Sequence, residues 1–193
     1  ENIEDHVRQQ TEKILDAARA SFVEDGYRGT DLGRIAKRTG LARNSLYRYF
    51  PSKDHILVAV LQQEMAPYIA RSKTLASDYR DPAARIDAWL DLQMELATGP
   101  CHAMIRILGD MTEASDDLLE QIGSLHVEPR AALQVAVAEL LEGSGRDPQI
   151  VSAMISSMLQ SAGGAAMNSK DPDPVVAELK QSVSSVLTRG EKR

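Results

Sequence analysis

The stretch from Gly26 to Lys53 constrains this chain more than any other, because its pattern fits two short helices joined by a tight turn. Thr30 or Asp31 can cap the first helix, since a side-chain oxygen accepts a bond from an unpaired amide of the first turn. Gly40 can end it in the left-handed conformation. Three apolar residues have the i, i+3, i+4 spacing of one helical face and should pack inward: Leu32, Ile35 and Ala36.

The second predicted helix, residues 42–50, has Leu46 and Phe50 at i and i+4 as its buried side. Its outward positions carry polar and basic side chains: Arg43, Asn44, Ser45, Tyr47 and Arg48. Arginine pairs with guanine, asparagine with adenine, and serine with either base edge. This face therefore suits a groove of DNA.

The charge of this stretch is strongly positive, with seven Lys or Arg against one acid, Asp31, although the whole chain is at −6. Cations that neutralise phosphates release condensed counterions, which supplies sequence-independent affinity for DNA. Spacing and charge alone also fit a solvated corner of an all-helical protein, so both interpretations stay open at this point.

The same stretch resembles the signature of the tetracycline-repressor (TetR) family of bacterial transcription regulators, over roughly residues 10–60. The matching positions, in fixed register, are Gly26, Tyr27, Thr30, Ile35, Ala36, Gly40, Leu41, Leu46, Tyr47, Tyr49, Phe50, Pro51, Ser52 and Lys53. The resemblance implies an all-α fold of about nine helices. A three-helix DNA-binding head with the helix-turn-helix would comprise residues 1–52, and a larger effector-binding and dimerisation domain residues 53–193.

The resemblance also implies which residues contact DNA. Arg43, Asn44 and Ser45, at the start of the second helix, would contact bases. Tyr47 and Tyr49 would contact phosphate or sugar, and Lys53 and Thr30 would contact the DNA backbone. Two positions depart from the family pattern. Ala42 stands where a Ser or Thr cap is usual, and Asn44 where a small Gly is common, so the operator sequence stays open.

Composition agrees with a helical protein. The chain has 193 residues, 43% of them hydrophobic and only 4% aromatic, and shows no alternating β-branched runs. The single cysteine, Cys101, excludes a disulfide or a four-cysteine metal site within one chain, and we expect no metal and no cofactor. No apolar stretch approaches the roughly 20 residues of a membrane span, and acids near the N-terminus argue against a signal peptide. We therefore expect a cytoplasmic protein with no membrane partner.

The remaining pattern predicts helices separated by Pro and Gly signals. We expect a bend near Pro67 in the helix 52–76 and a kink at Pro129 in the helix 115–141. A loop is expected at 143–145. Outside the helix-turn-helix, the predicted ranges are 4–25, 52–76, 81–98, 101–113, 115–141, 147–167 and 172–189.

The last two predicted helices, 147–167 and 172–189, combine small residues and methionine in one with an apolar stripe in the other. The stripe consists of Val176, Leu179, Val183, Val186 and Leu187 and must be covered by something. By resemblance these helices pair with their copies as a four-helix homodimer interface. The alternative is that they close the core of the monomer.

A ligand pocket between the helices of 53–167 is also implied by the resemblance. Its candidate lining is rich in methionine, whose flexible thioether suits a lipophilic small-molecule effector: Met65, Tyr68, Trp89, Met94, Met104, Leu108, Met111, His126, Met154 and Met158. Methionine at helical spacing also occurs as plain core, and His126 has no specificity assigned to it.

The predicted function is a homodimeric repressor that binds a palindromic double-stranded DNA operator and is released by a small molecule. The alternative is a constitutive or protein-controlled DNA-binding regulator, and activation in place of repression stays open. An enzyme is not expected. Cys101 and His102 are adjacent on a helix start and point in different directions, and no Gly-rich phosphate loop or nucleophile elbow occurs.

Overall fold

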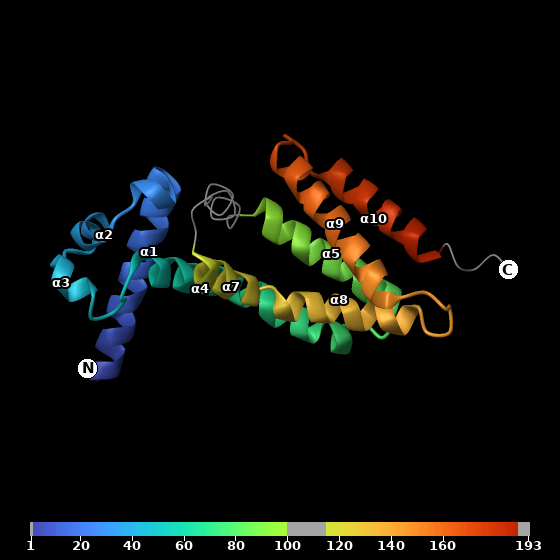
Figure 1. The fold of residues 1–193 in the computed structure, drawn as a ribbon, viewed down its shortest axis with the longest axis horizontal. Helices are drawn as coiled ribbons and strands as arrows, with labels where there is room; N and C mark the ends of the chain where they lie inside the picture. Colours follow the sequence, from blue (N-terminus) through green and yellow to red (C-terminus); the bar gives the residue numbers. More distant parts are fainter. Residues whose placement is uncertain (1, 100–114, 189–193) are drawn as a thin grey trace. The chain divides into compact units, whose positions relative to one another are not determined.

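The computed structural model describes residues 2–99 and 115–188, and in these ranges all regular structure is helical. The predicted all-α fold is therefore confirmed. Figure 1 shows the nine helices of the described ranges: α1 (Ile3–Gly29), α2 (Leu32–Thr39), α3 (Arg43–Leu46), α4 (Lys53–Asp78), α5 (Pro82–Thr98), α7 (Asp116–Ser124), α8 (Val127–Leu140), α9 (Pro148–Met167) and α10 (Asp173–Thr188). The predicted helix 101–113 lies outside the described residues.

The described chain forms two compact units. The first contains residues 2–64 and 115–124, and the second contains residues 65–99 and 125–188. Helix α4 contributes its first part, up to Glu64, to one unit and its remainder to the other.

In the first unit α1 packs against α2, and α2 packs against α3. Gly26 interrupts the helical backbone of α1 with a φ of 71° and a ψ of 175°, directly after the predicted helix range 4–25. Val7 of the same helix is 45% exposed. The buried residues include Ile14, Leu15, Ala18, Phe22, Ile35, Leu46, Ile56 and Leu57.

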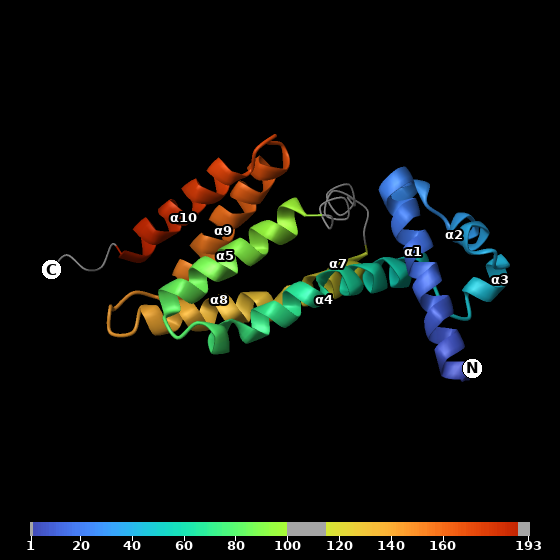
Figure 2. The same ribbon diagram turned by 180° about the vertical axis from the view of Figure 1, so that it is seen from behind.

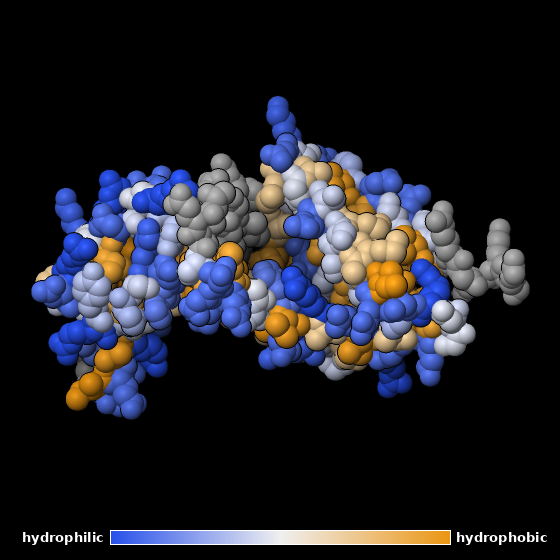
Figure 3. Space-filling model, viewed as in Figure 1, coloured by the Kyte–Doolittle hydropathy of each residue, from blue (hydrophilic) through white to orange (hydrophobic). Residues whose placement is uncertain are grey.

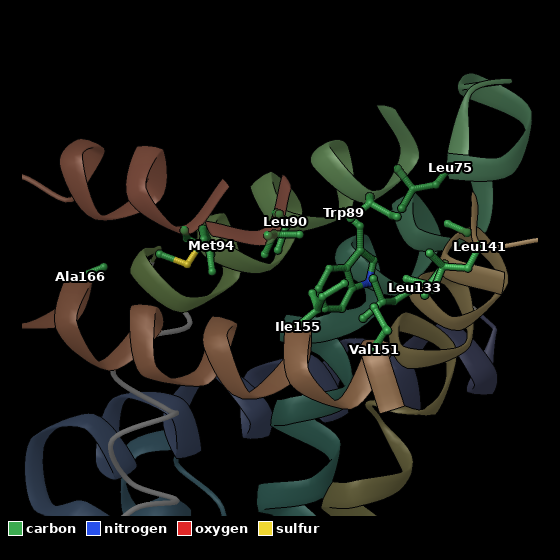
Figure 4. Close-up of a cluster of buried hydrophobic side chains, with 14 residues drawn as sticks. Leu75, Trp89, Leu90, Met94, Leu133, Leu141, Val151, Ile155 and Ala166 are labelled. Carbon is green, nitrogen blue, oxygen red and sulfur yellow. The ribbon is translucent and has the colours of Figure 1, made fainter. Parts of the chain in front are cut away.

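In the second unit α5 packs against both α8 and α9, and α10 covers α9 and part of α5. Figures 1 and 2 show these helices side by side from both directions. Trp89 of α5 lies among Leu133, Val151 and Ile155 in the centre of the core (Figure 4). Its indole Nε1 donates a 2.7 Å hydrogen bond to the carbonyl of Pro129, so the polar edge of the ring is satisfied without water.

Predicted helix starts are confirmed where an acid precedes a proline. The Asp81 carboxylate accepts from two amides of α5, and that of Asp147 accepts from two amides of α9. Proline follows at the first helical position, where its missing N–H leaves no bond unmade. The predicted loop at 143–145 is confirmed, with left-handed Gly143 and Gly145.

Helix α4 continues through Pro67 to Asp78 without interruption, in agreement with the predicted range 52–76. The prediction of a kink at Pro129 within one long helix was wrong. The predicted single helix 115–141 is two helices, which separate at residues 125–126. Pro129 therefore lies in the first turn of α8, where a missing N–H costs no intrahelical bond.

Helix α9 requires one further correction. It has 20 residues with a mean hydropathy of 1.2, so by length and composition it resembles a membrane span, contrary to the expectation that no stretch does. Helices at protein cores and interfaces have the same composition. Among the described helices it is the one that meets this criterion.

Candidate nucleic-acid interface and ligand site

The turn of the helix-turn-helix is built from local signals in the sequence. The Asp31 carboxylate accepts a 2.9 Å bond from the Arg34 amide, and this bond holds the pKa of Asp31 below its usual value. Gly40 has a φ of 72°, and beyond it the Leu41 amide donates to the Ala36 carbonyl at 3.0 Å. This six-residue return bond is the usual way to close a helix end with a left-handed glycine. The turn therefore fixes where α3 begins.

Helix α3 spans Arg43–Leu46 and continues as a turn to Tyr49, so its regular part is shorter than predicted. Leu46 is fully buried and Phe50 is 9% exposed, which confirms the predicted inner side. Ala42 makes no side-chain cap. The opposite side carries exposed Arg43, Asn44, Tyr47 and Arg48, whereas Ser45 and Tyr49 are half-buried.

Two of the seven predicted DNA contacts already have partners inside the protein. Thr30 is 1% exposed, and its hydroxyl donates a 2.8 Å bond to the Gly26 carbonyl. The Lys53 ammonium donates a 2.7 Å bond to the Tyr27 carbonyl and lies 3.9 Å from the centre of the Tyr27 ring. Burial lowers the pKa of Lys53, despite the nearby Asp54 carboxylate.

The positive charge of the stretch Gly26–Lys53 is partly neutralised by acidic residues that lie outside it. Arg34 forms a 2.6 Å ion pair with Asp25, and Arg38 forms one with Glu24. Both acids lie on α1, just before the stretch that was counted. Within the described part of the chain, Lys37 of α2, Arg43 of α3 and Arg48 in the turn after α3 are exposed and have no ion pair, so they supply the free positive charge of this face.

The ten predicted ligand-lining residues are only partly brought together. Trp89 and Met94 lie in the apolar core of the second unit, and Met158 packs against it. Met65 is buried, Tyr68 and His126 are half-buried, and Met154 is 47% exposed. Met104, Leu108 and Met111 lie outside the described residues. Burial lowers the pKa of His126, and the nearby Arg130 charge lowers it further.

Two grooves of the second unit are each lined by none of those ten residues. One, of about 400 Å³, lies between α5, α10 and the end of α8. The other, of about 240 Å³, lies between α4, α5 and α8. Sequence reasoning also missed Gln93 of α5, which is 8% exposed and whose side-chain amide nitrogen has no partner within the described residues. Its signal, a polar residue within an apolar helix, is visible in the sequence.

Metal chemistry finds no support in residues 2–99 and 115–188, where no three His, Cys, Asp or Glu side chains gather into a possible site. The exposed surface beside α3 is suited to binding DNA. A short helix presents Arg43, Asn44 and Tyr47 to solvent on a rigid support, and these groups suit base edges and phosphates. The fold and this surface define a helix-turn-helix DNA-binding regulator.

Comparison with known proteins identifies the family. Residues 14–60 match the model of a family described as "Bacterial regulatory proteins, tetR family". The HTH-type transcriptional regulator RutR of Escherichia coli K12 is 28% identical over 157 residues, which are 80% of this chain and 74% of RutR. The HTH-type transcriptional repressor KstR of Rhodococcus jostii is 38% identical over 123 residues, 61% of this chain and 56% of KstR.

Among solved structures, the regulator FadR of Bacillus subtilis in complex with stearoyl-CoA has a similar fold. Its TM-score is 0.71 at 23% identity, with 93% of this chain and 98% of that chain covered. The chain belongs to the TetR family of transcriptional regulators.

Proposed function

We propose that this chain is a cytoplasmic homodimeric repressor that binds an approximately palindromic operator and is released by a lipophilic small molecule. The observation that carries the proposal is the solvent-facing side of α3, where Arg43, Asn44 and Tyr47 stand above a buried Leu46. Residues 1–52 would bind DNA, and residues 53–193 would bind effector and partner. RutR and KstR, to which this chain is similar, are named as regulators of transcription.

Dimerisation through residues 147–189 is supported chiefly by α9. This helix has no charged residue, yet Ile150 is 61% and Met154 is 47% exposed on it. In Figure 3, hydrophobic residues gather over the surface where α9 lies. Small side chains at Ala153 and Ser157 leave room for close approach of a second helix. The stripe of α10 packs largely within the chain, with Leu179 and Val183 buried, so α9 would be the main contact.

A two-fold dimer would place two copies of α3 in successive major grooves, about 34–36 Å apart. The operator would then be an approximate palindrome. An effector that binds better to a dimer state whose DNA-binding heads do not fit the operator would lower operator affinity, with a coupling free energy of about 1–3 kcal/mol. DNA would lower effector affinity by the same factor.

The effector is proposed to be lipophilic and to lie against the candidate residues of the second unit. FadR, of similar fold, is described in complex with stearoyl-CoA, so acyl-CoA thioesters are the first compounds to test. The alternative, a regulator without a small-molecule effector, is favoured by one observation. Trp89 and Met94 are 3% and 2% exposed within a packed apolar core.

Selection of binding sites from random duplex DNA tests the DNA-binding part. The protein should enrich a palindrome, and Arg43→Ala should relax base preference at one position in each half-site, costing about 1–3 kcal/mol. Arg80→Ala, which removes an exposed cation of the second unit, is the matched control and should leave the preference unchanged. An unchanged preference for Arg43→Ala would refute our assignment of the base-reading residues.

Sedimentation at micromolar concentration tests the interface. Ile150→Glu and Met154→Glu should each shift the protein from dimer to monomer, because a charge buried in an apolar interface is strongly unfavourable. Val127→Glu, which places the same charge on another exposed apolar position, should stay dimeric. A monomeric wild-type protein would overturn the proposed interface.

A further inference from the structure

The outward side of α8 carries a row of exposed apolar side chains. Val127 is 59% and Val135 is 51% exposed, and Ala131 between them is also exposed. These three residues, which we call the α8 row, are spaced by four positions and so form one ridge along the helix. Single exposed apolar residues are ordinary on a protein surface, whereas a contiguous set of them is typical of a contact surface.

A groove lies directly beside this ridge, between α4, α5 and α8. It has a volume of about 240 Å³, and its walls include Ala131 and Val135 of the α8 row together with Leu75 and Ala76 of α4. Helices pack by placing the ridge of one into the groove of another. The same face of the protein therefore offers both parts of such a contact.

Two opposite charges on this face have no partner. Lys73 of α4 and Glu128 of α8 both line the groove and are both exposed, and neither forms an ion pair or a side-chain hydrogen bond with the residues described. Arginines nearby in the sequence are paired, Arg71 with Glu95 and Arg85 with Glu139. The face thus presents one unpaired charge of each sign.

We propose that this face binds the same face of a second copy of the chain, as a two-fold interface separate from α9. In a two-fold contact, residue i meets residue j and j meets i. A surface with a ridge beside a groove, and with one free charge of each sign, is complementary to itself under this symmetry.

The spacing of the α8 row defines the arrangement of the two copies. Their α8 helices cross at Ala131, whose small side chain permits close approach. Val127 then lies against Val135 of the partner subunit, because each is four residues from the crossing point. Lys73 pairs with Glu128 of the partner subunit, and the symmetry forms this pair twice.

The consequence is association of two dimers into a tetramer, and the count of four chains rests on the α9 dimer of the proposed function. A tetramer would carry four DNA-binding heads and would occupy two operators together. The contact is small and belongs to the size class of transient complexes. We therefore expect a dissociation constant of about 10–100 μM for this step.

Sedimentation equilibrium of the full chain, from about 1 to about 500 μM, tests the proposal. The wild type should be dimeric at the lower end and approach a tetramer at the upper end. Val127→Glu should stay dimeric throughout, because its charge would be buried against Val135 of the partner subunit. Ile150→Glu should be monomeric at the lower end and still pair at the upper end, which distinguishes loss of the α9 interface from loss of this one.

Charge reversal gives a sharper test. Lys73→Glu and Glu128→Lys should each weaken tetramer formation at least about tenfold, because like charges then face each other. An equimolar mixture of these two variants should associate like the wild type, since both charge contacts between them again join opposite signs. The matched controls are Lys13→Glu and Glu12→Lys, which change the same charges on the exposed side of α1 and should leave association unchanged.

All of these positions are exposed, so the melting temperature of each variant should match that of the wild type. A wild-type protein that stays dimeric at the highest concentration would overturn the proposal and leave this face to a different partner. Unchanged tetramer formation in Lys73→Glu, or a mixture of the two charge variants that does not associate, would contradict it equally.

Discussion

The ammonium of Lys53 lies 3.9 Å from the centre of the Tyr27 ring and donates a 2.7 Å hydrogen bond to the carbonyl of the same residue. The Tyr27 hydroxyl in turn donates to the carboxylate of Asp54, the next residue after Lys53. Burial raises the pKa of Tyr27, and the bond to Asp54 raises it further. These contacts connect the end of α1 to the start of α4, so Lys53 is a structural residue as well as a proposed DNA contact.

Replacement of Lys53 by Ala should therefore lower stability and DNA affinity together. Loss of the cation–π contact and the hydrogen bond should cost about 1–2 kcal/mol of unfolding free energy, measured by urea denaturation. Lys37→Ala, which removes an exposed lysine of α2 with no ion pair in the described ranges, should leave stability unchanged. Equal stability of Lys53→Ala and wild type would show that the contact with Tyr27 does not hold the head together.

The hydroxyl of Tyr47 is proposed to bind phosphate or sugar. Tyr47 directly follows α3 and is 44% exposed. Tyr47→Phe should weaken binding to all duplexes by one hydrogen bond, about 0.5–1.5 kcal/mol, and leave the base preference as it is. Anisotropy with the selected duplex and with an unrelated one measures both. A loss confined to the selected duplex would place Tyr47 among the base-reading residues instead.

Gly40 should tolerate no side chain without loss of stability. Its φ of 72° is in the left-handed region, and an added β-carbon there costs about 1–2 kcal/mol. Thermal unfolding of Gly40→Ala measures this cost. Gly123→Ala is the control, because a β-carbon would meet nothing within 4 Å in helix α7 and alanine is preferred in helices by up to about 1 kcal/mol. A stabilising Gly40→Ala would contradict the described turn.

Stability should fall on mild acidification because of His126. Burial holds its folded pKa below the usual 6.5, so the unfolded chain takes up more protons below that pH. The contribution of neutral His126 is complete above pH 6.5 and is lost as the pH falls through the folded pKa. His126→Asn should flatten the dependence of melting temperature on pH between about 5 and 7, whereas the exposed-helix change His6→Gln should not. An unaltered profile in His126→Asn would refute this assignment.

Local signals predicted much of the fold. The caps at Asp31 and Asp81 and the left-handed Gly40 depend on neighbours a few residues away, so the sequence contains their whole cause. The position of Pro129 in the first turn of α8 could not be predicted in this way. A proline is compatible with either a kink or a first helical turn, and packing decides between them.

The candidate sites were less predictable, because they join residues far apart in the chain. Counting charge within one stretch missed Glu24 and Asp25, which pair with two of its arginines. The exposed side chains of α3 follow helical spacing and were predicted from it. The groove of about 240 Å³ between α4, α5 and α8 brings Ser72, Arg85 and Val135 together from three helices, and no spacing rule links them.

The central claim is release of DNA by a small molecule, and operator binding during effector titration tests it most directly. The measurement is fluorescence anisotropy of the selected palindromic duplex with the purified dimer, while saturated acyl-CoA thioesters of increasing chain length are added. Our account predicts that one range of chain lengths abolishes binding, with a saturable and reciprocal effect of DNA on effector affinity. Undiminished binding across this series and a wider set of lipophilic compounds would contradict it and favour constitutive or protein-controlled regulation.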